Sequence, residues 1–325
     1  MKNLTKLSAL SLMTTAFTLG CVTNTKHNEN LSESRVIEFE SSAEGFNTKT
    51  IFYVGKKEVV AFDAQFTESN ATASIQHLRK FTDKPITWLV ITHPNPDKFN
   101  GANVFRSEGA KVIASTATVN NIPAVHGYKK YYFVEMAKMF TNETYPSEPT
   151  IDESFDTQLS LRLSGGETIE LVEYNKPGIS TNQTVAILPN KQGLIVGDLI
   201  HYKAHAWLEG GIVDSKATPT ISSWVSLLKQ ITEENDSDIK VYGGRGEATN
   251  LLEAIEVQIE YLQKADGIVS NYVKKLGTKK SELTTEKATK HYENLTQEFQ
   301  STFPDYALSY MVQYGIYGLV NSKLN

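Results

Sequence analysis

The segment ITWLVITHPNPDK, residues 86–98, constrains the fold of this 325-residue chain more than any other. Its first half, Ile86–Thr92, has the length and apolar composition of a buried strand. His93, Asp97 and Lys98 follow directly, separated by two prolines. Because folds that combine strands and helices place their sites at strand ends, we expect these polar side chains to belong to a site.

The rest of the chain repeats this pattern of strands, helices and polar loops. Further strand patterns cover residues 36–39, 48–54, 59–62, 159–163, 168–173, 184–188, 193–199 and 239–242. Helical spacing covers residues 68–82 and 221–231, and a long helix is expected from about residue 247, with Leu251, Leu252, Ile255, Ile259 and Leu262 buried. Two halves that each combine sheet and helix predict an α+β architecture.

Two aromatic segments favour packing over a direct role in a site. In Tyr128–Phe140, one helical face carries Tyr132, Met136, Met139 and Phe140, which indicates core packing, with a lid or pocket wall as the alternative. The last sixty residues have a helical pattern with an aromatic stripe formed by Phe303, Tyr306, Tyr310, Tyr314 and Tyr317. This stripe predicts packing against the main domain or a homodimer through the C-terminal helices.

The N-terminal 34 residues indicate export. Lys2 and Lys6 precede an apolar stretch, residues 7–19, that is too short to span a bilayer and is typical of a signal peptide. Cys21, the only cysteine, follows a small residue, so residues 1–21 resemble a bacterial lipoprotein signal, although Thr18 stands where leucine is usual. We therefore expect a membrane anchor through lipidated Cys21 in the bacterial cell envelope, on an outer-membrane or periplasmic lipoprotein. The alternative is a secreted soluble protein.

Composition and net charge limit the classes of partner that this chain is expected to bind. Residues 22–34 are polar and aperiodic, which is typical of a flexible tether. The formal net charge of -5, without a long run of like charges, argues against a nucleic-acid surface. A small molecule or another protein is the expected partner.

Residues 35–265 resemble the metallo-β-lactamase superfamily, with residues 266–325 as a C-terminal helical extension. Four pieces occur in the family's order, each next to an expected strand: Asp63; His93-Pro-Asn-Pro-Asp97-Lys98; Pro177-Gly178-Ile179; and Gly197-Asp198 followed by Gly243-Gly244-Arg245-Gly246. The resemblance implies an αββα sandwich of two sheets covered by helices, with a site at one edge between the sheets. It also implies two metal ions, usually zinc, that activate a water.

Position by position, the family's metal ligands are only partly kept. His93, Asp97 and Asp198 occupy ligand positions, whereas Asn95, Lys98, Ile179 and Arg245 stand where the family has histidine. Isoleucine cannot coordinate a metal, an amide oxygen is a poor zinc ligand, and charged lysine and arginine have no free lone pair. We therefore predict that Lys98 and Arg245 form an ion-pair cluster with the two aspartates in place of zinc.

The pattern leaves the function open between two classes. In the first, the protein lacks a cofactor and binds a small, anionic ligand or a partner in the old cleft, using Lys98, Arg245, Asn95 and His201. In the second, it is a hydrolase of a lactam, lactone, thioester or phosphoester with a single metal on His93, Asp97, Asp198 and His201, with His205 as a further candidate. Asp97 and Asp198 are also candidate catalytic groups of a metal-free acid–base enzyme, although paired carboxylates are poor bases.

Overall fold

Two six-stranded sheets form the centre of the fold in the computed structural model, which describes residues 34–324. The first sheet has the order β1-β2-β3-β4-β5-β6, in which the first three strands are antiparallel and β3 to β6 are parallel. Its strands are β1 (Arg35–Glu40), β2 (Lys49–Val54), β3 (Val59–Phe62), β4 (Ile86–Ile91), β5 (Lys111–Ser115) and β6 (Glu153–Phe155).

The second sheet has the order β14-β13-β10-β9-β8-β7, and only β10 and β13 are parallel. Its strands are β7 (Gln158–Arg162), β8 (Thr168–Tyr174), β9 (Gln183–Ile187), β10 (Leu194–His201), β13 (Lys240–Arg245) and β14 (Thr249–Asn250). A separate hairpin pairs β11 (Gly211–Val213) with β12 (Lys216–Thr218).

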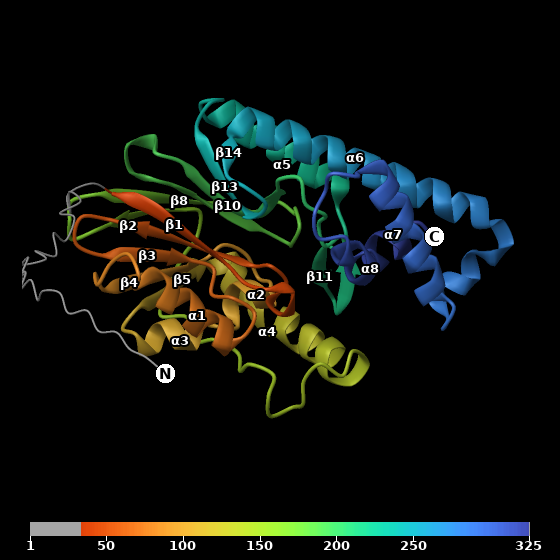
Figure 1. Cartoon of the computed structure of the whole chain (residues 1–325), viewed down its shortest axis with the longest axis horizontal. Helices are drawn as coiled ribbons and strands as arrows, with labels where there is room; N and C mark the ends of the chain where they lie inside the picture. The colour runs from red at the N-terminus through yellow and green to blue at the C-terminus, as the bar shows by residue number, and fades with distance from the viewer. Residues whose placement is uncertain (1–33, 325) are drawn as a thin grey trace, which may run out of the picture. The chain divides into compact units, whose positions relative to one another are not determined.

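Helices cover the outer faces of both sheets, which gives the four αββα layers expected from the sequence (Figure 1). The first sheet is covered by α1 (Glu68–Leu78), α3 (Ala102–Ser107) and α4 (Thr116–Tyr131). The second is covered by α5 (Ile221–Glu234) and α6 (Leu251–Leu276), and the one-turn helix α2 (Pro96–Phe99) follows β4.

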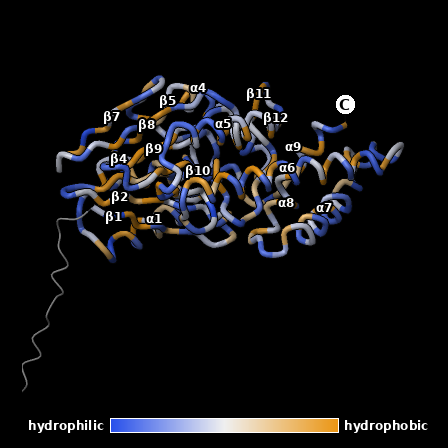
Figure 2. The backbone as a smooth tube through the Cα atoms, turned by 90° about the horizontal axis from the view of Figure 1, so that it is seen from above, coloured by the Kyte–Doolittle hydropathy of each residue, from blue (hydrophilic) through white to orange (hydrophobic). Residues whose placement is uncertain are grey.

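Three apolar cores hold these layers together. One lies between the sheets and includes Tyr53, Phe62 and Ile195, and the other two lie between each sheet and its helices. Figure 2 shows hydrophobic residues concentrated along the strands, whereas the outer helix α7 (Ala288–Thr302) is largely hydrophilic. Burial on both faces explains why β3, β4 and β10 read as continuous apolar runs in the sequence.

The C-terminal helices continue from the main fold without a linker. Helix α6 runs through the boundary predicted between residues 265 and 266, and is followed by a 3₁₀ segment (Gly277–Thr284), α7, α8 (Tyr310–Gly315) and α9 (Tyr317–Asn321). Leu295, Phe299 and Val312 from this region are buried in the same core as Leu227 and Val241. The helical extension is therefore an integral part of the fold.

Two packing predictions need correction. The segment predicted as one helix from Tyr128 belongs to α4 and a π-helical turn, Tyr132–Met136, in which Met136 is 66% exposed because it lies on the outer surface. Leu252 is 42% exposed, since it lies beside the first buried residue of α6 and not on its inner face. The predicted aromatic stripe does not lie on one helix, because Phe303 and Tyr306 lie between α7 and α8, Tyr310 and Tyr314 lie on α8, and Tyr317 lies on α9.

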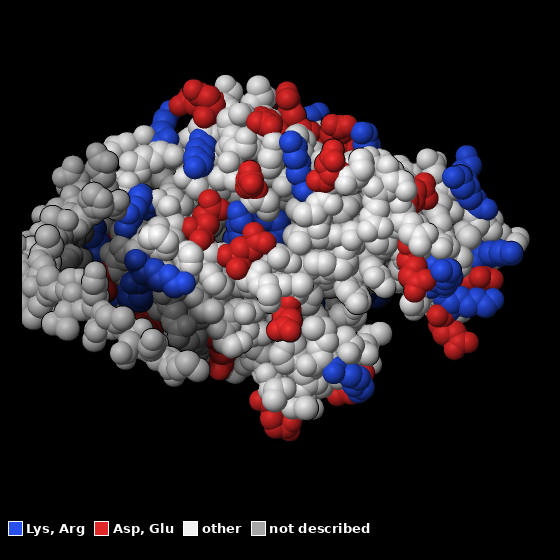
Figure 3. Space-filling view, viewed as in Figure 1, with Lys and Arg blue, Asp and Glu red and all other residues white. Residues whose placement is uncertain are grey.

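The predicted signal, Cys21 and the tether up to residue 33 lie outside the described residues. Within residues 34–324, none of the helices is long and apolar enough to cross a bilayer. Figure 3 shows basic and acidic side chains interspersed on the face in view.

Candidate functional site

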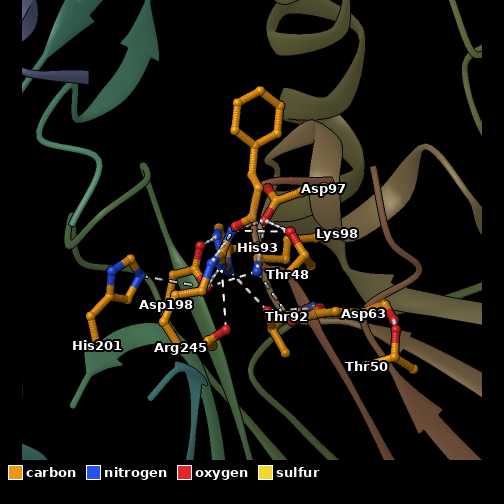
Figure 4. A network of polar contacts seen from close by, with 12 residues as sticks. Thr48, Thr50, Asp63, Thr92, His93, Asp97, Lys98, Asp198, His201 and Arg245 are labelled. Atoms are coloured by element: carbon orange, nitrogen blue, oxygen red, sulfur yellow. Dashed lines mark hydrogen bonds and ion pairs between the residues drawn. The ribbon is translucent and has the colours of Figure 1, made fainter. Parts of the chain in front are cut away.

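Strand ends of both sheets meet at the site. Asp63 follows β3, the segment from His93 to Lys98 follows β4, and Asp198 and Arg245 come from β10 and β13. Figure 4 shows the side chains converging on one cluster, with His201 and Asp63 at opposite ends. The structure thus brings together the residues that the sequence pattern singled out.

The one-turn helix α2 directs Asp97 and Lys98 into this cluster. Asn95 precedes the helix with an extended backbone and Pro96 occupies its first turn, where the fixed φ of proline is favourable. Both following side chains turn inward, and Lys98 is 0% exposed. The local sequence therefore buries a charged amine directly beside two carboxylates.

Four ion pairs link the two cations to the two aspartates. Lys98 Nζ lies 2.7 Å from Asp198 Oδ1 and 3.0 Å from Asp97 Oδ2. Arg245 places Nη1 2.7 Å from Asp198 Oδ1 and Nη2 2.9 Å from Asp97 Oδ2. These contacts satisfy buried charges that would otherwise be costly to desolvate.

The pKa values reflect this mutual stabilisation. Burial alone would raise the pKa of Asp97, but Lys98 and Arg245 outweigh it and hold that pKa at about 2. Burial would likewise raise the pKa of Asp198, and the same two cations hold it well below its usual range. Burial would lower the pKa of Lys98 and of Arg245, but the carboxylates raise both. All four groups are therefore charged at neutral pH.

Glycines give the cluster its space. A Cβ on Gly244 would lie 1.7 Å from Asp198 Oδ1, so no larger residue fits beside that carboxylate. Gly197 has a φ of +52°, and a Cβ there would lie 2.6 Å from Thr92 Oγ1. The Gly-Asp and Gly-Gly-Arg-Gly sequences are thus explained by close backbone approach.

A second polar chain lies behind the ion pairs. The Thr92 hydroxyl is 2.9 Å from both Asp63 Oδ1 and His93 Nδ1. Burial raises the pKa of Asp63 to about 7, and burial lowers the pKa of His93 to about 4, so its ring is neutral at pH 7. His93 is therefore a neutral, buried neighbour of Asp198, at 3.8 Å from Nε2 to Oδ2.

Two imidazole nitrogens near Asp198 have no hydrogen-bond partner within residues 34–324. They are Nε2 of His93 and Nε2 of His201, and the latter is 3.7 Å from Asp198 Oδ1. His201 is the last residue of β10 and not a loop residue, and its Nδ1 faces the carbonyl of His205 at 3.2 Å. The two rings flank Asp198 on either side.

His205 does not belong to the site. Its ring packs among four aromatic rings, those of Tyr261, Phe299, Phe303 and Tyr306. His205 was a further candidate ligand of the single-metal alternative, but strand β10 ends at His201 and the ring of His205 turns into the core of the C-terminal helices.

A small cleft opens beside the ion-pair cluster. Its polar end is lined by Asn95, Asp97, Asp198, His201 and Arg245. Its walls are mainly apolar and come from residues distant in sequence: Phe46, Phe66, Pro96, Lys129, Phe133, Trp207 and Met311. Apolar walls around a few polar groups are typical of a small-molecule site.

The wall residues were not identified from the sequence. Phe46, Trp207 and Met311 come from three loops or helices that carry no motif, and only their meeting in space defines the cleft. Phe133 lies within the segment Tyr128–Phe140, for which a pocket wall was the alternative interpretation. Lys129, in the same segment, forms a buried ion pair with Glu209 and lies 5.1 Å from the Trp207 ring.

Comparisons place the fold among known proteins. The family model described as "Metallo-beta-lactamase superfamily" matches residues 44–242. The structure is similar to a metallo-β-lactamase from Pontibacter korlensis, with a TM-score of 0.51 and 15% identity over 71% of this chain and 99% of that one. It is also similar to the structure titled TMB-1, with a TM-score of 0.50 and 16% identity over 72% of this chain and 97% of that one. A third similar structure is that of DIM-1 metallo-β-lactamase exposed to ceftazidime, with a TM-score of 0.50 and 17% identity over 72% of this chain and 98% of that one. A search of curated protein sequences found no match.

Proposed function

Because this chain belongs to the metallo-β-lactamase superfamily, we propose that it is a member in which two fixed cations replace the metal centre and the adjoining cleft binds a small molecule. One observation carries this proposal: Lys98 and Arg245 both donate to the carboxylates of Asp97 and Asp198, two of the three ligand-type residues that the chain keeps. The cleft beside them supplies the binding volume.

A dizinc centre does not fit these side chains. The carboxylate oxygens already accept hydrogen bonds from a lysine and an arginine whose raised pKa values keep them protonated, and a protonated nitrogen cannot bind a metal. Ile179 is buried in the apolar core behind the second sheet and offers no donor. Within the described part of the chain, no group of three or more His, Cys, Asp or Glu is arranged to hold a metal ion.

Binding in the cleft is testable by filling it. Met311→Trp places a larger side chain in the cleft and should abolish the binding of small aromatic fragments, which ligand-observed NMR measures. Tyr314→Trp is the control, because Tyr314 lies on the same helix but outside the cleft. Fragment binding that survives Met311→Trp in a folded protein would place the ligand elsewhere and contradict the proposal.

The second candidate is a hydrolase of the superfamily with one metal on His93, Asp97, Asp198 and His201. The unpartnered Nε2 atoms of His93 and His201 on either side of Asp198 favour it. A panel of lactam, lactone, thioester and phosphoester substrates, assayed with and without added zinc, separates the two candidates. Zinc-dependent turnover that is lost in His93→Ala would support the hydrolase and contradict the binding protein.

We also propose that the protein is exported and anchored through a lipid on Cys21, as the N-terminal sequence indicates. Labelled palmitate should be incorporated into the wild-type protein in bacteria and not into Cys21→Ala. Incorporation that is equal in both proteins, or absent from both, would contradict the anchor. A homodimer through the C-terminal helices is a further proposal, which analytical ultracentrifugation of the mature protein tests.

A further inference from the structure

The cations of the cluster have little capacity left for an anionic ligand. Arg245 uses all its N–H groups: Nε donates to the Phe46 carbonyl, Nη1 faces Asp198 and the Gly244 carbonyl, and Nη2 donates to Thr48 and Asp97. Lys98 is fully buried against both aspartates and does not line the cleft. An anion at this end of the cleft would meet two carboxylates and find no free donor on Arg245.

The atom left open at this end is a hydrogen-bond acceptor. Every hydrogen bond and ion pair of Asp97 within residues 34–324 uses Oδ2, which leaves Oδ1 of this carboxylate available.

An open acceptor favours a ligand that donates. Asp198 Oδ1 already accepts from Lys98 and Arg245 at 2.7 Å each, whereas Asp97 Oδ1 accepts from no group within residues 34–324. A bound N–H or O–H donor would supply that missing partner.

The walls favour a positive charge on that donor. Phe46 contacts Phe66 and Trp207 with ring centroids 4.9 Å and 5.8 Å apart, and Phe66 contacts Phe133 at 5.0 Å. All four rings line the cleft. A cation close to aromatic faces is attracted by the ring quadrupoles, and the open Oδ1 of Asp97 offers it a charged hydrogen-bond acceptor.

We infer that the cleft takes a small organic amine, bound as an ammonium ion whose N–H groups contact Asp97 while its apolar part packs against the aromatic walls. This inference rests on the proposed ligand-binding function and gives the ligand the opposite charge to the one expected from the sequence. Among the described residues that line the cleft, Lys129 is the cation that retains unused N–H groups. Glu209 balances its charge, so Lys129 favours a neutral acceptor group on the ligand and not a net anion.

Three probes of one shape test the charge. 2-Phenylethylamine, 2-phenylethanol and phenylacetate are titrated separately into the mature wild-type protein by calorimetry or NMR. We expect the amine to bind on the order of ten-fold more tightly than the alcohol, and phenylacetate to bind weakest. Equal affinities of amine and alcohol, or tightest binding of phenylacetate, would overturn the amine inference while leaving ligand binding intact, and binding of none of the three would overturn both.

A matched pair of variants tests the aromatic contribution. Phe133→Leu removes one wall of the cleft and should weaken amine binding several-fold more than alcohol binding, because only the charged probe uses the ring face. Phe81→Leu makes the same substitution on an exposed ring outside the cleft and should leave both affinities unchanged. A Phe133→Leu protein that loses affinity for both probes equally would contradict a cation held by the rings.

Discussion

Single side chains set the stability of the buried cluster. Asp198 Oδ1 accepts hydrogen bonds from both Lys98 and Arg245, so removing the charge of Asp198 removes a carboxylate partner from two buried cations. Breaking a buried ion pair by removing one member typically costs about 3–5 kcal/mol. We therefore expect Asp198→Asn to lower the free energy of unfolding by an amount in that range, measured by urea denaturation.

Asp152→Asn is the matched control for that substitution. Asp152 pairs with Arg106 near the surface, where solvent screens the interaction, so its loss should change the free energy of unfolding only slightly. Equal effects of the two substitutions would show that the buried cluster contributes no more than a surface pair.

Gly244 tests the space around the same carboxylate. Gly244→Ala would place a methyl group within 1.7 Å of Asp198 Oδ1, so one of the two must move and the ion pairs must lengthen. We expect a clear loss in melting temperature. Gly267→Ala, on α6 with no atom within 4 Å of the added methyl, should stabilise the helix by about 0.5–1 kcal/mol. A Gly244→Ala protein as stable as Gly267→Ala would contradict the packing described for the site.

At the scale of secondary-structure elements, the C-terminal helices belong to the core. Leu295 on α7 is fully buried, whereas Leu252 on α6 is substantially exposed. Leu295→Ala should cost about 2–5 kcal/mol of unfolding free energy and Leu252→Ala much less, since only the first opens a cavity. If chemical denaturation shows no difference between them, the C-terminal helices do not share the core.

The same helices bury a histidine. Burial lowers the pKa of His205 to about 4, so between pH 6.5 and 4 the unfolded chain binds a proton that the folded chain does not. Stability from this group is therefore present above about pH 6.5 and is lost as the pH falls toward 4. His205→Gln removes the titrating group.

We expect the stability difference between His205→Gln and the wild type to shift in favour of the variant as the pH falls from 7 to 4. Urea denaturation at several pH values measures this difference. A difference that does not change with pH would contradict a buried, neutral His205.

Some elements and site residues could be predicted from the sequence and others could not. Strands β3, β4 and β10 are largely apolar segments that carry or precede polar residues, so their order along the chain could be predicted. The same motif predicted that Asp97, Lys98, Asp198 and Arg245 meet at one site. The cleft walls did not, because Phe46, Trp207 and Met311 have ordinary sequence surroundings and approach one another only through long-range packing. The ligand charge that we propose also needed the hydrogen-bond geometry of Arg245, which no sequence pattern contains.

At the scale of the whole molecule, the fold is that of the superfamily. Two sheets bring His93, Asp97 and Asp198 to one edge, where Lys98 and Arg245 pair with both aspartates. We propose that these two buried cations supply the positive charge that metals supply in other members. The fold therefore persists without determining the activity.

The zinc content of the purified mature protein tests this account most directly. It is measured by mass spectrometry after expression with added zinc, beside a variant that combines Asn95→His, Lys98→His, Ile179→His and Arg245→His. We predict that the wild type carries no stoichiometric zinc, whereas the variant gains it, because the four imidazoles restore donors and remove both cations. Near-stoichiometric zinc in the wild-type protein would contradict the replacement of metal by fixed cations.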